Sequence, residues 1–523
     1  MVVGEVATGV DLLVIGGGPG GYAAALRGAA AGRSVTLVER DRIGGVCLNV
    51  GCIPSKALIH VADTAGLPAE ASGIGVDLTA TVDLDRAQAW IGDVVGRLTG
   101  GVEQLLRDAG VTIATGTARF ATARRVAVTR GDDAAFYEFK SVVLATGSRP
   151  VELPDVGFDG RTVLDSTAAL ALRRVPTRLT VVGGGYIGVE LGGAFAKLGA
   201  EVTIVELADQ LLPGMPPGLA RAVERALRAR GLTIRLGTKV LGRDGDDLVV
   251  EGPDGEARLP IGLAGRPDTG AGTPADRRSS GTPPVPQERR SGVTGDDGRG
   301  GRGDGVVVVV VGRRPNTDAL GLTGAGVPLD ADGRVIVAPD RRAAPDVYAL
   351  GDITPGPALA HKATAEADVA VSAAGGRRAA FDPAAIPAVV FSDPQIATVG
   401  LTAEQAAEAG AETTTFRFPL SASGRALALA RPEGYVEIVA ERAGDGSAGS
   451  AGAGGTVLGV HMVGAGVSEL AAEAALAIEM AATVEDLALT IAPHPTLSEA
   501  LAEAAMGAAG RPLHVRRRRK ETP

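Results

Sequence analysis

The amino-acid sequence predicts an α/β protein with two doubly wound units and a smaller α+β unit toward its C-terminal end. An apolar strand, a glycine-rich turn and a helix follow one another near residue 11, and the same order returns near residue 179. After Pro387 the pattern changes to short strands interleaved with alanine-rich helices, which is typical of an α+β unit. The length of 523 residues is enough for all three units.

The first repeat begins with an apolar strand and ends with an acidic residue. We expect a strand over Asp11–Ile15, a helix over Tyr22–Ala31 and a second strand over Ser34–Val38, followed directly by Glu39. In such a unit the turn glycines allow a tight bend, close approach of a pyrophosphate and close helix packing, while the acid binds a ribose diol. The order predicts a Rossmann-like dinucleotide site. Its turn contains Gly16, Gly18 and Gly21.

The second repeat is offset from the first by 167 residues and matches it at five positions. These positions are Gly183, Gly185, Gly188, Gly199 and Glu206. Two such units in one chain predict two different dinucleotides. Because the carboxylate of Glu206 repels a 2′-phosphate, and no arginine follows it closely, NAD is favoured over NADP.

Both cysteines of the chain lie in one stretch, Gly44–Lys56. Cys47 and Cys52 are five positions apart, in what we expect to be a loop leading into a helix over Ser55–Ala65. A thiol near a helix N-terminus is stabilised as the thiolate, which is the reactive form. The pair therefore predicts a redox-active disulfide.

Three other roles for the cysteine pair compete with redox chemistry. A zinc site needs about four ligands, and only His60 is near enough in sequence to add one. A structural disulfide closing so short a loop constrains the unfolded chain little. Inert, buried thiols remain open as an alternative.

Three further strand ends carry candidate binding residues. A strand over Ser141–Leu144 leads into Thr146 and Gly147, and one over Val306–Val311 leads into Gly312. The strand ending at Gly351-Asp352 presents a carboxylate that could bind a ligand hydroxyl, although a plain turn has the same pattern. A long helix over Val82–Ala109 carries the only tryptophan, Trp90, which we expect in the core.

A histidine between two prolines stands out near the C-terminal end. The backbone of His494 is restricted by Pro493 and Pro495, and Glu499 falls on the first turn of the helix expected over Ser498–Ala508. A carboxylate that orients an imidazole is a common arrangement for a general base. We expect the remaining histidines to be structural or solvated: His60, His361, His461 and His514.

Composition and charge limit the possible partners and locations. The net charge of −9 predicts no nucleic-acid binding. We see no apolar run long enough for a membrane span and no secretory signal, so we expect a cytoplasmic protein. We expect residues 263–304 to form a disordered insertion, residues 444–455 a flexible loop, and residues 516–520 a solvated basic tail.

Together, these motifs resemble those of the flavoprotein disulfide reductases that use two dinucleotides. The resemblance is carried by the stretch from Gly44 to Lys56 and by the motif from His494 to Glu499, and it extends from Asp11 to about Gly510. It implies an FAD-binding domain over residues 1–150, completed by about 318–385. It also implies an NAD-binding domain over 151–317, a dimerisation domain over 386–511 and a basic tail over 512–523.

The resemblance also implies roles for individual residues. Asp352 would contact the flavin ribityl chain, and Lys56 with Glu190 would form an ion pair near the flavin N5. Cys47 would react with substrate and Cys52 with the flavin, while His494, held by Glu499, would act as base on the disulfide of the other subunit. The implied FAD residues also include Gly16, Gly18, Gly21, Glu39, Thr146 and Gly147, and those on the NAD side are Gly183, Gly185, Gly188, Glu206 and Gly312.

Among these reductases, the motifs are most similar to those of the branch that oxidises dihydrolipoyl groups with NAD. That implies a homodimer working with lipoyl domains of 2-oxo acid dehydrogenase or glycine cleavage complexes. The alternatives are a related reductase of glutathione or mycothiol disulfides and a scaffold that only binds a lipoyl complex. Glu206 disfavours the NADP-dependent relatives, and a mercuric reductase would carry a terminal cysteine pair, which is missing after Cys52.

Overall fold

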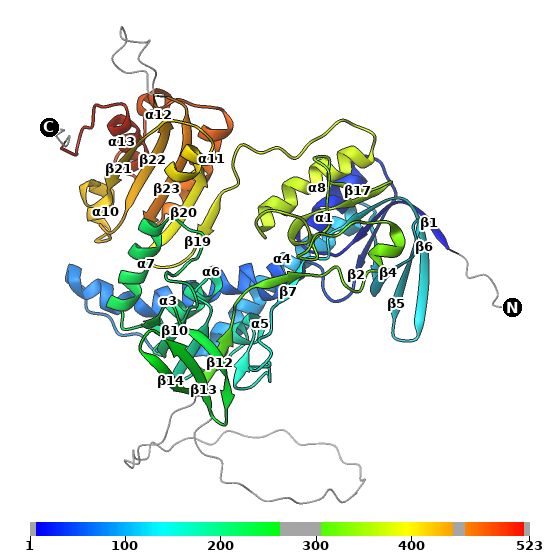
Figure 1. Ribbon diagram of the computed structural model, residues 1–523, viewed down its shortest axis with the longest axis horizontal. Helices are drawn as coiled ribbons and strands as arrows, with labels where there is room; N and C mark the ends of the chain where they lie inside the picture. The colour runs from blue at the N-terminus through cyan, green and yellow to red at the C-terminus, as the bar shows by residue number, and fades with distance from the viewer. Residues whose placement is uncertain (1–6, 262–304, 443–454, 517–523) are drawn as a thin grey trace, which may run out of the picture.

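Three sheets organise the protein, each at the centre of its own unit (Figure 1). The structure is a computed structural model that describes residues 7–261, 305–442 and 455–516. The predicted insertion at 263–304 lies outside the described residues, as do nearly all of the loop at 444–455 and the last residues of the tail. The three units confirm the predicted fold class, two doubly wound units and a C-terminal α+β unit.

The first unit is built on a mainly parallel sheet with strand order β17-β18-β6-β1-β2-β3, extended by β5 and β4. Its central parallel strands β1, β2 and the last part of β6 are apolar and buried because helices cover the sheet there. Its strands are β1 (Thr8–Ile15), β2 (Val35–Glu39), β3 (Thr112–Thr115), β4 (Thr117–Thr122), β5 (Arg125–Arg130), β6 (Asp133–Leu144), β17 (Arg342–Ala344) and β18 (Val347–Ala349). Its helices are α1 (Pro19–Ala30), α2 (Gly45–Val50), α3 (Cys52–Ala71), η1 (Ser72–Ile74), α4 (Leu84–Asp108), η2 (Leu322–Ala325), η3 (Gly351–Ile353) and α8 (Ala360–Ala374).

The second unit has a parallel sheet of order β11-β10-β9-β15-β8 and an antiparallel sheet β12-β13-β14. A short pair of β7 (Ser148–Pro150) with β16 (Arg313–Pro315) forms where the chain crosses between the first two units. Its strands are β8 (Val163–Leu164), β9 (Arg178–Val182), β10 (Glu201–Val205), β11 (Thr233–Arg235), β12 (Lys239–Asp244), β13 (Asp247–Gly252), β14 (Gly255–Pro260) and β15 (Gly305–Val309). Its helices are α5 (Ser166–Leu170), α6 (Tyr186–Lys197) and α7 (Pro217–Ala229).

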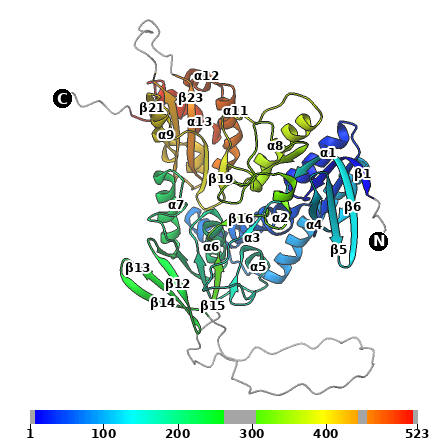
Figure 2. The ribbon, with the colours of Figure 1, turned by 45° about the vertical axis from the view of Figure 1, so that its right-hand side comes forward.

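The third unit is an antiparallel sheet of order β19-β20-β23-β22-β21 with helices packed on it (Figure 2). Its strands are β19 (Ala388–Val390), β20 (Gln395–Gly400), β21 (Thr413–Pro419), β22 (Tyr435–Glu441) and β23 (Val457–Gly464). Its helices are α9 (Ala403–Glu408), η4 (Leu420–Ala422), α10 (Gly424–Ala428), η6 (Val467–Leu470), α11 (Ala471–Glu479), α12 (Val484–Leu489) and α13 (Ser498–Ala508).

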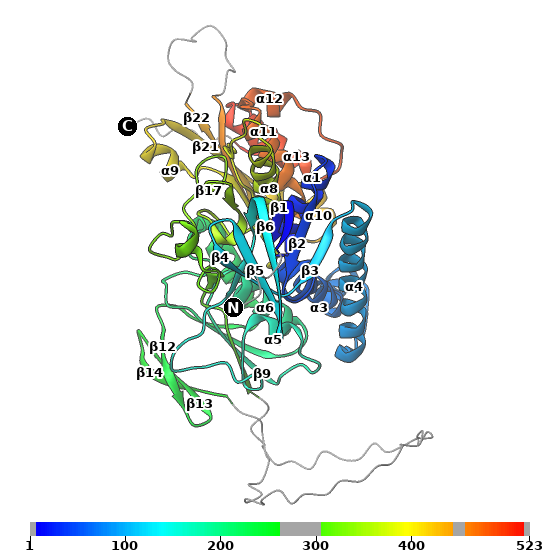
Figure 3. The ribbon, with the colours of Figure 1, turned by 90° about the vertical axis from the view of Figure 1, so that its right-hand side faces the viewer.

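Helix α3 connects the units because it packs against α4 in its own unit and against α6 of the second. Figure 3 shows α4 as a long helix at the outer edge of the first unit. Trp90 on α4 is 43% exposed and lies beside the ring of His60, so the expectation of a core tryptophan is wrong. The helix buries mainly leucine and isoleucine on its inner face instead.

One stretch within the described part of the chain, Gly45–Ile74, is by length and composition long and apolar enough to cross a membrane, with a mean hydropathy of 1.3 in its 18-residue window. It is not an uninterrupted apolar run of the kind that the sequence analysis excluded, because Lys56, Asp63 and Glu70 lie within it. The stretch covers α2, α3 and η1, and it includes Lys56, whose ammonium group forms an ion pair with Glu190 of α6. These contacts are those of a helix packed within the fold.

Candidate active site

Cys47 and Cys52 lie on two successive helices. Cys47 belongs to α2 and Cys52 is the first residue of α3, so the expected loop is helical and the second helix begins three residues earlier than predicted. The break between the helices falls at Gly51, whose φ of −137° and ψ of −106° are not helical. This break turns the second helix so that Cys52 lies at its N-terminus, where free amides stabilise a thiolate. No disulfide joins Cys47 and Cys52 in this structure.

The two thiols differ in acidity because one donates a hydrogen bond to the other. The hydrogen bond from Cys47 lowers the pKa of Cys52 from its ordinary value of 9.0 to about 7, although desolvation opposes the change and Lys56 supports it. The same hydrogen bond, together with burial, raises the pKa of Cys47. Near neutral pH, Cys52 therefore ionises before Cys47 and is partly in the thiolate form.

Lys56 supplies the positive charge beside Cys52. Its ammonium Nζ lies 2.7 Å from Oε2 of Glu190, which is 4% exposed. The other carboxylate oxygen of Glu190 accepts a hydrogen bond of 2.9 Å from the backbone amide of Phe391. Nζ of Lys56 also lies 4.7 Å from the centre of the Phe391 ring. The predicted ion pair is therefore present and is held by a residue of the third unit.

A single cavity joins the cysteines to the first glycine turn. Its lining comes from the segments that follow the carboxyl ends of β1, β2, β6 and β18, from α2 and α3, and from α6 of the second unit. The cavity therefore extends from the expected ribose-binding acid to the reactive thiols, the shape expected of a dinucleotide site. The predicted residues along it are Gly16, Gly18, Glu39, Cys47, Cys52, Lys56, Thr146, Gly147, Glu190 and Asp352.

The last glycine of each turn allows the helix to approach the preceding strand. A Cβ atom on Gly21 would lie 1.7 Å from the carbonyl oxygen of Gly16, and one on Gly188 would lie 1.9 Å from that of Gly183. No side chain fits at such distances. The two turns therefore share one backbone arrangement, as their sequences predicted.

The two acidic residues after the second strands also have equivalent contacts. Oε2 of Glu39 accepts a hydrogen bond of 2.6 Å from the Gly17 amide, and Oε2 of Glu206 accepts one of the same length from the Gly184 amide. These bonds fix each carboxylate at the edge of its glycine turn, where a ribose would bind.

Gly45, at the start of α2, is part of the site although its role was not predicted. A Cβ atom there would lie 2.7 Å from the Cα of Gly18, because the backbone passes directly over the glycine turn. Gly18 itself has free space, since a Cβ there would meet no atom closer than 4.0 Å. The bare backbone on both sides fits a pyrophosphate, which is bound through amide groups.

Asn316 holds the Thr146-Gly147 turn and was likewise not predicted. Its backbone amide donates to the Gly147 carbonyl at 2.9 Å, its side-chain amide donates to the Thr146 carbonyl at 2.9 Å, and its own carbonyl accepts from the Thr146 hydroxyl at 2.8 Å. Because Asn316 lies 170 positions away in sequence, local pattern alone could not reveal these contacts.

Hydrogen bonds and buried ion pairs fix the turn that carries Asp352. Oδ2 of Asp352 accepts a 2.6 Å hydrogen bond from the Ser148 hydroxyl. Glu366 accepts one of 2.6 Å from the Gly351 amide and is itself paired with Lys362 and Arg341. Asp352 lies on this fixed turn and lines the cavity.

The second glycine turn lies outside the cavity but shares a helix with it. Helix α6 begins directly after Gly185, and its first turns contribute Tyr186, Ile187 and Glu190 to the cavity lining. Gly312 is close to the same junction, since its carbonyl accepts a 3.0 Å bond from the Val151 amide. A second dinucleotide bound at this turn would therefore lie next to the thiol end of the cavity.

His494 and Glu499 form the expected pair, apart from the cysteines. Nδ1 of His494 lies 2.8 Å from Oε1 of Glu499, whose other oxygen accepts a 2.8 Å bond from the Thr496 amide. Desolvation favours a higher pKa for Glu499, but these hydrogen bonds lower it below its ordinary value. The imidazole is 78% exposed and is not part of the cavity lining within this chain.

The other histidines have structural or surface positions, as expected. Buried His461 contacts the Thr398 hydroxyl and the Leu401 carbonyl, and burial lowers its pKa. His514 pairs with Glu503 one turn along α13 from Glu499. Among the described residues there is no group of three or more histidine, cysteine or acidic side chains suited to a metal ion.

The fold and the site together define a class of enzyme, in which two dinucleotide sites lie on either side of a reactive dithiol. The chain matches the pyridine nucleotide-disulphide oxidoreductase family model over residues 10–263 and 282–367, and the dimerisation domain of the same family over residues 386–505. The chain belongs to this family. It is an oxidoreductase that uses FAD and NAD, and the residues along the cavity fit the first of these cofactors.

Several curated relatives of the chain are dihydrolipoyl dehydrogenases. The chain is 41% identical to the dihydrolipoyl dehydrogenase of Geobacillus stearothermophilus, covering 98% of this chain and 99% of the relative. It is 43% identical to dihydrolipoyl dehydrogenase 2 of Haloarcula marismortui, over 99% and 100% of the two chains. Among solved structures, LpdA from Mycobacterium tuberculosis is 27% identical, with a TM-score of 0.79 and coverage of 95% and 99%.

Proposed function

We propose that this protein is a dihydrolipoyl dehydrogenase, which oxidises dihydrolipoyl groups to lipoyl groups and reduces NAD. The observation that carries the proposal is the acidic thiol Cys52, hydrogen-bonded to Cys47 at the end of a dinucleotide cavity. The name shared by the relatives at about 40% identity supports the substrate. A scaffold that only binds a lipoyl complex would not need this thiol pair, which disfavours the binding role.

The thiol acidities support a division of labour between the cysteines. In the oxidised enzyme the substrate thiolate attacks the sulfur of Cys47, the Cys47–Cys52 bond breaks, and Cys52 leaves as a thiolate stabilised by Lys56. The second substrate thiol then attacks the substrate sulfur bound to Cys47, which forms the cyclic lipoyl disulfide and releases Cys47. Two electrons and two protons pass from substrate to enzyme in this exchange.

His494 is proposed as the base that removes the substrate protons. The Nδ1 contact with Glu499 leaves Nε2 free to accept a proton from the dihydrolipoyl thiol, and the carboxylate stabilises the resulting imidazolium. Because His494 is exposed and apart from the cysteines of its own chain, we propose that it serves the cavity of a second copy. The family's dimerisation domain at residues 386–505 supports such a homodimer.

FAD, when bound, would accept two electrons from the dithiol, and NAD would accept them as a hydride. We propose that residues 1–150 and about 318–385 hold FAD, that 151–317 hold NAD, and that 386–511 form the dimer contact. Gly16, Gly18, Glu39, Thr146 and Asp352 would hold FAD along the cavity. Gly183, Gly185, Gly188, Glu206 and Gly312 would hold NAD at the second turn.

We further propose that the protein is cytoplasmic and acts on lipoyl domains of 2-oxo acid dehydrogenase or glycine cleavage complexes. The second candidate function is reduction of a glutathione-type or mycothiol-type disulfide, which would use the same dithiol. Glu206 argues against those relatives that depend on NADP.

A steady-state comparison tests the proposal. The purified protein would be assayed with dihydrolipoamide and NAD, and in parallel with glutathione and mycothiol disulfides plus NADH or NADPH. We expect kcat/KM for dihydrolipoamide to exceed the others by several orders of magnitude. A higher value for either disulfide would establish the second candidate instead.

A further inference from the structure

Helices α3 and α6 are joined by two ion pairs spaced seven residues apart on both helices. The first pair is Lys56 with Glu190 at 2.7 Å, and the second is Asp63 with Lys197 at 2.6 Å. Seven residues correspond to two helical turns, so both pairs lie on the facing sides of the helices. The first pair lines the cavity, whereas the second lies outside its lining.

One loop of the third unit, residues 391–394, contacts both ion pairs. At the first pair, the Phe391 amide donates to Glu190 at 2.9 Å and its ring lies beside the Lys56 ammonium. At the second pair, Oδ2 of Asp393 lies 2.5 Å from Nζ of Lys197. Because Phe391 and Asp393 are two residues apart, a shift of either one displaces the other.

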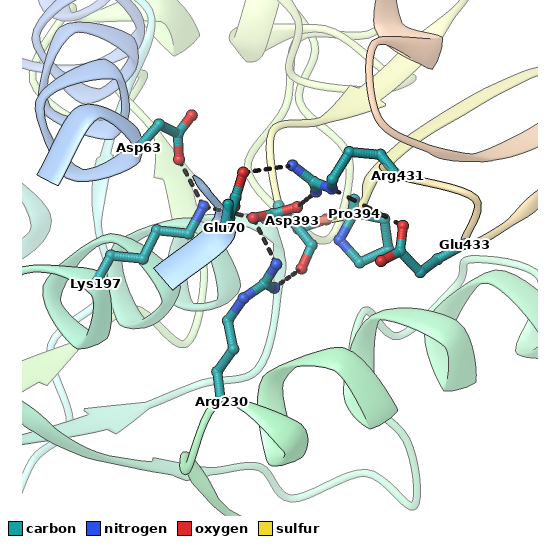
Figure 4. A network of polar contacts seen from close by, with 9 residues as sticks. Asp63, Glu70, Lys197, Arg230, Asp393, Pro394, Arg431 and Glu433 are labelled. Carbon is teal, nitrogen blue, oxygen red and sulfur yellow. Dashed lines mark hydrogen bonds and ion pairs between the residues drawn. The ribbon is translucent and has the colours of Figure 1, made fainter. Parts of the chain in front are cut away.

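Asp393 is the centre of the charged network in Figure 4. Besides Lys197, its carboxylate pairs with Arg230, which follows α7, at 2.7 Å, and with Arg431, which follows α10. Arg230 also donates to the backbone carbonyl of Asp393. Arg431 in turn contacts Glu70 of α3 at 3.5 Å and Glu433 at 3.8 Å. Residues of the second and third units therefore meet at this carboxylate, and the first unit joins the network through Glu70 on Arg431 and Asp63 on Lys197.

The network keeps Asp393 charged and in place. Its side chain is only 18% exposed, yet Lys197, Arg230 and Arg431 together lower its pKa against the opposing effect of burial. A partly buried carboxylate among three cations is costly to neutralise, because the cations would then face one another without a partner. The loop is thus fixed at Asp393 by contacts that do not involve the cavity.

We propose that Asp393 is a positioning residue for Lys56: by fixing loop 391–394 to Lys197, it keeps the Phe391 amide on Glu190 and the Lys56 ammonium beside Cys52. The inference deepens the proposed function and rests on it in one respect, that the Cys52 thiolate is the reactive group. The charged and titratable groups that act on Cys52 come from four helices: Tyr22, Cys47, Lys56, Tyr186 and Glu190.

The test measures the pKa of Cys52 in an Asp393→Asn variant. Both proteins would carry Cys47→Ser, which keeps a hydroxyl donor and leaves Cys52 as the only thiol of the chain. The rate of alkylation by iodoacetamide, followed against pH in the FAD-loaded protein, gives the midpoint of thiolate formation. Because Lys56 lowers this pKa more than Glu190 raises it, loosening the pair should raise the midpoint by about 0.5 to 1 unit.

The sign of the shift separates positioning from direct electrostatics. Loss of a negative charge at Asp393, acting through space alone, would lower the Cys52 midpoint. Glu433→Gln is the matched control, because it removes one negative charge from the same network and touches only Arg431. We expect its midpoint to equal that of the parent. An unchanged or lowered midpoint in Asp393→Asn, or an equal rise in Glu433→Gln, would overturn the proposal.

A second variant covers the case in which Asp393→Asn does not fold. Lys197→Met removes the cation that links Asp393 to Asp63, and it would be titrated in about 1 M salt, where the Debye length is about 3 Å. A rise of the Cys52 midpoint that persists in salt supports positioning, and an unchanged midpoint refutes it. The titration contains no lipoyl substrate, so its outcome is independent of the steady-state comparison that tests the proposed function.

Discussion

The acidity of Cys52 depends mainly on one hydrogen bond, and replacing the donor tests that dependence. Cys47→Ser keeps a donor to the Cys52 sulfur, whereas Cys47→Ala removes it. The pKa of Cys52 is lowered from 9.0 to about 7, and the Cys47 hydrogen bond is the largest cause. At pH 7 a thiol with a pKa of about 7 is roughly half ionised, whereas one with a pKa of about 9 is only about 1% ionised.

We therefore expect the Ser variant to titrate near pH 7 and the Ala variant at least about 1 unit higher. Thiolate absorbance near 240 nm, or the pH dependence of iodoacetamide alkylation, measures the midpoint directly. At pH 7 the alkylation rate should fall at least about fivefold from Ser to Ala, because the thiolate is the nucleophile. Equal midpoints in the two variants would show that helix position and Lys56, rather than the Cys47 donor, set the acidity.

Four further substitutions have expected outcomes that can be measured. His494→Ala should lower dithiol turnover by about 10²- to 10⁴-fold while NADH still reduces the flavin, and unchanged turnover would remove its role as base. Gly188→Ala places a Cβ atom 1.9 Å from a carbonyl oxygen, so NAD binding should be lost while the purified protein remains yellow; intact NAD affinity in a titration would contradict this. Glu206→Ala should raise KM for NAD by about tenfold and reduce the discrimination against NADP, which steady-state kinetics with both cofactors would check. Asp393→Asn should lower the melting temperature at pH 7, and the difference from wild type should vanish in acid. A carboxylate whose pKa is lowered in the folded protein stabilises the fold above its unfolded-state pKa and loses that contribution as the pH falls through its folded-state pKa. A difference that persists in acid would show that the charge of Asp393 is not the cause.

Patterns with a clear period were predictable from the sequence. The helix over Ser498–Ala508 has the predicted bounds, and the long helix expected over Val82–Ala109 is observed as Leu84–Asp108. The two glycine turns were predictable because their chemistry is local: each needs a tight bend and a close helix within a few residues. Their contacts in the structure are equivalent.

The cysteine stretch shows where local pattern failed. We expected a loop leading into a helix over Ser55–Ala65, but the chain forms two helices, Gly45–Val50 and Cys52–Ala71, on either side of Gly51. Gly45 is required by the approach of the backbone to Gly18, a tertiary contact that overrides local preference. Trp90 was misplaced for a related reason: burial depends on which face of α4 meets the fold, and the tryptophan lies on the other face.

By itself the sequence determined the chemical groups of the site: two cysteines, two glycine turns with their acids, and a histidine followed five residues later by a carboxylate. Only the tertiary structure decided how they act on one another. Three features depend on residues that meet only in space. They are the lower pKa of Cys52 than of Cys47, the hydrogen bonds of Asn316 to the Thr146 turn, and the contact of loop 391–394 with Glu190. The physical reason is range: turn and capping preferences act over a few residues, whereas hydrogen bonds and charges act over a few ångströms, whatever the separation in sequence.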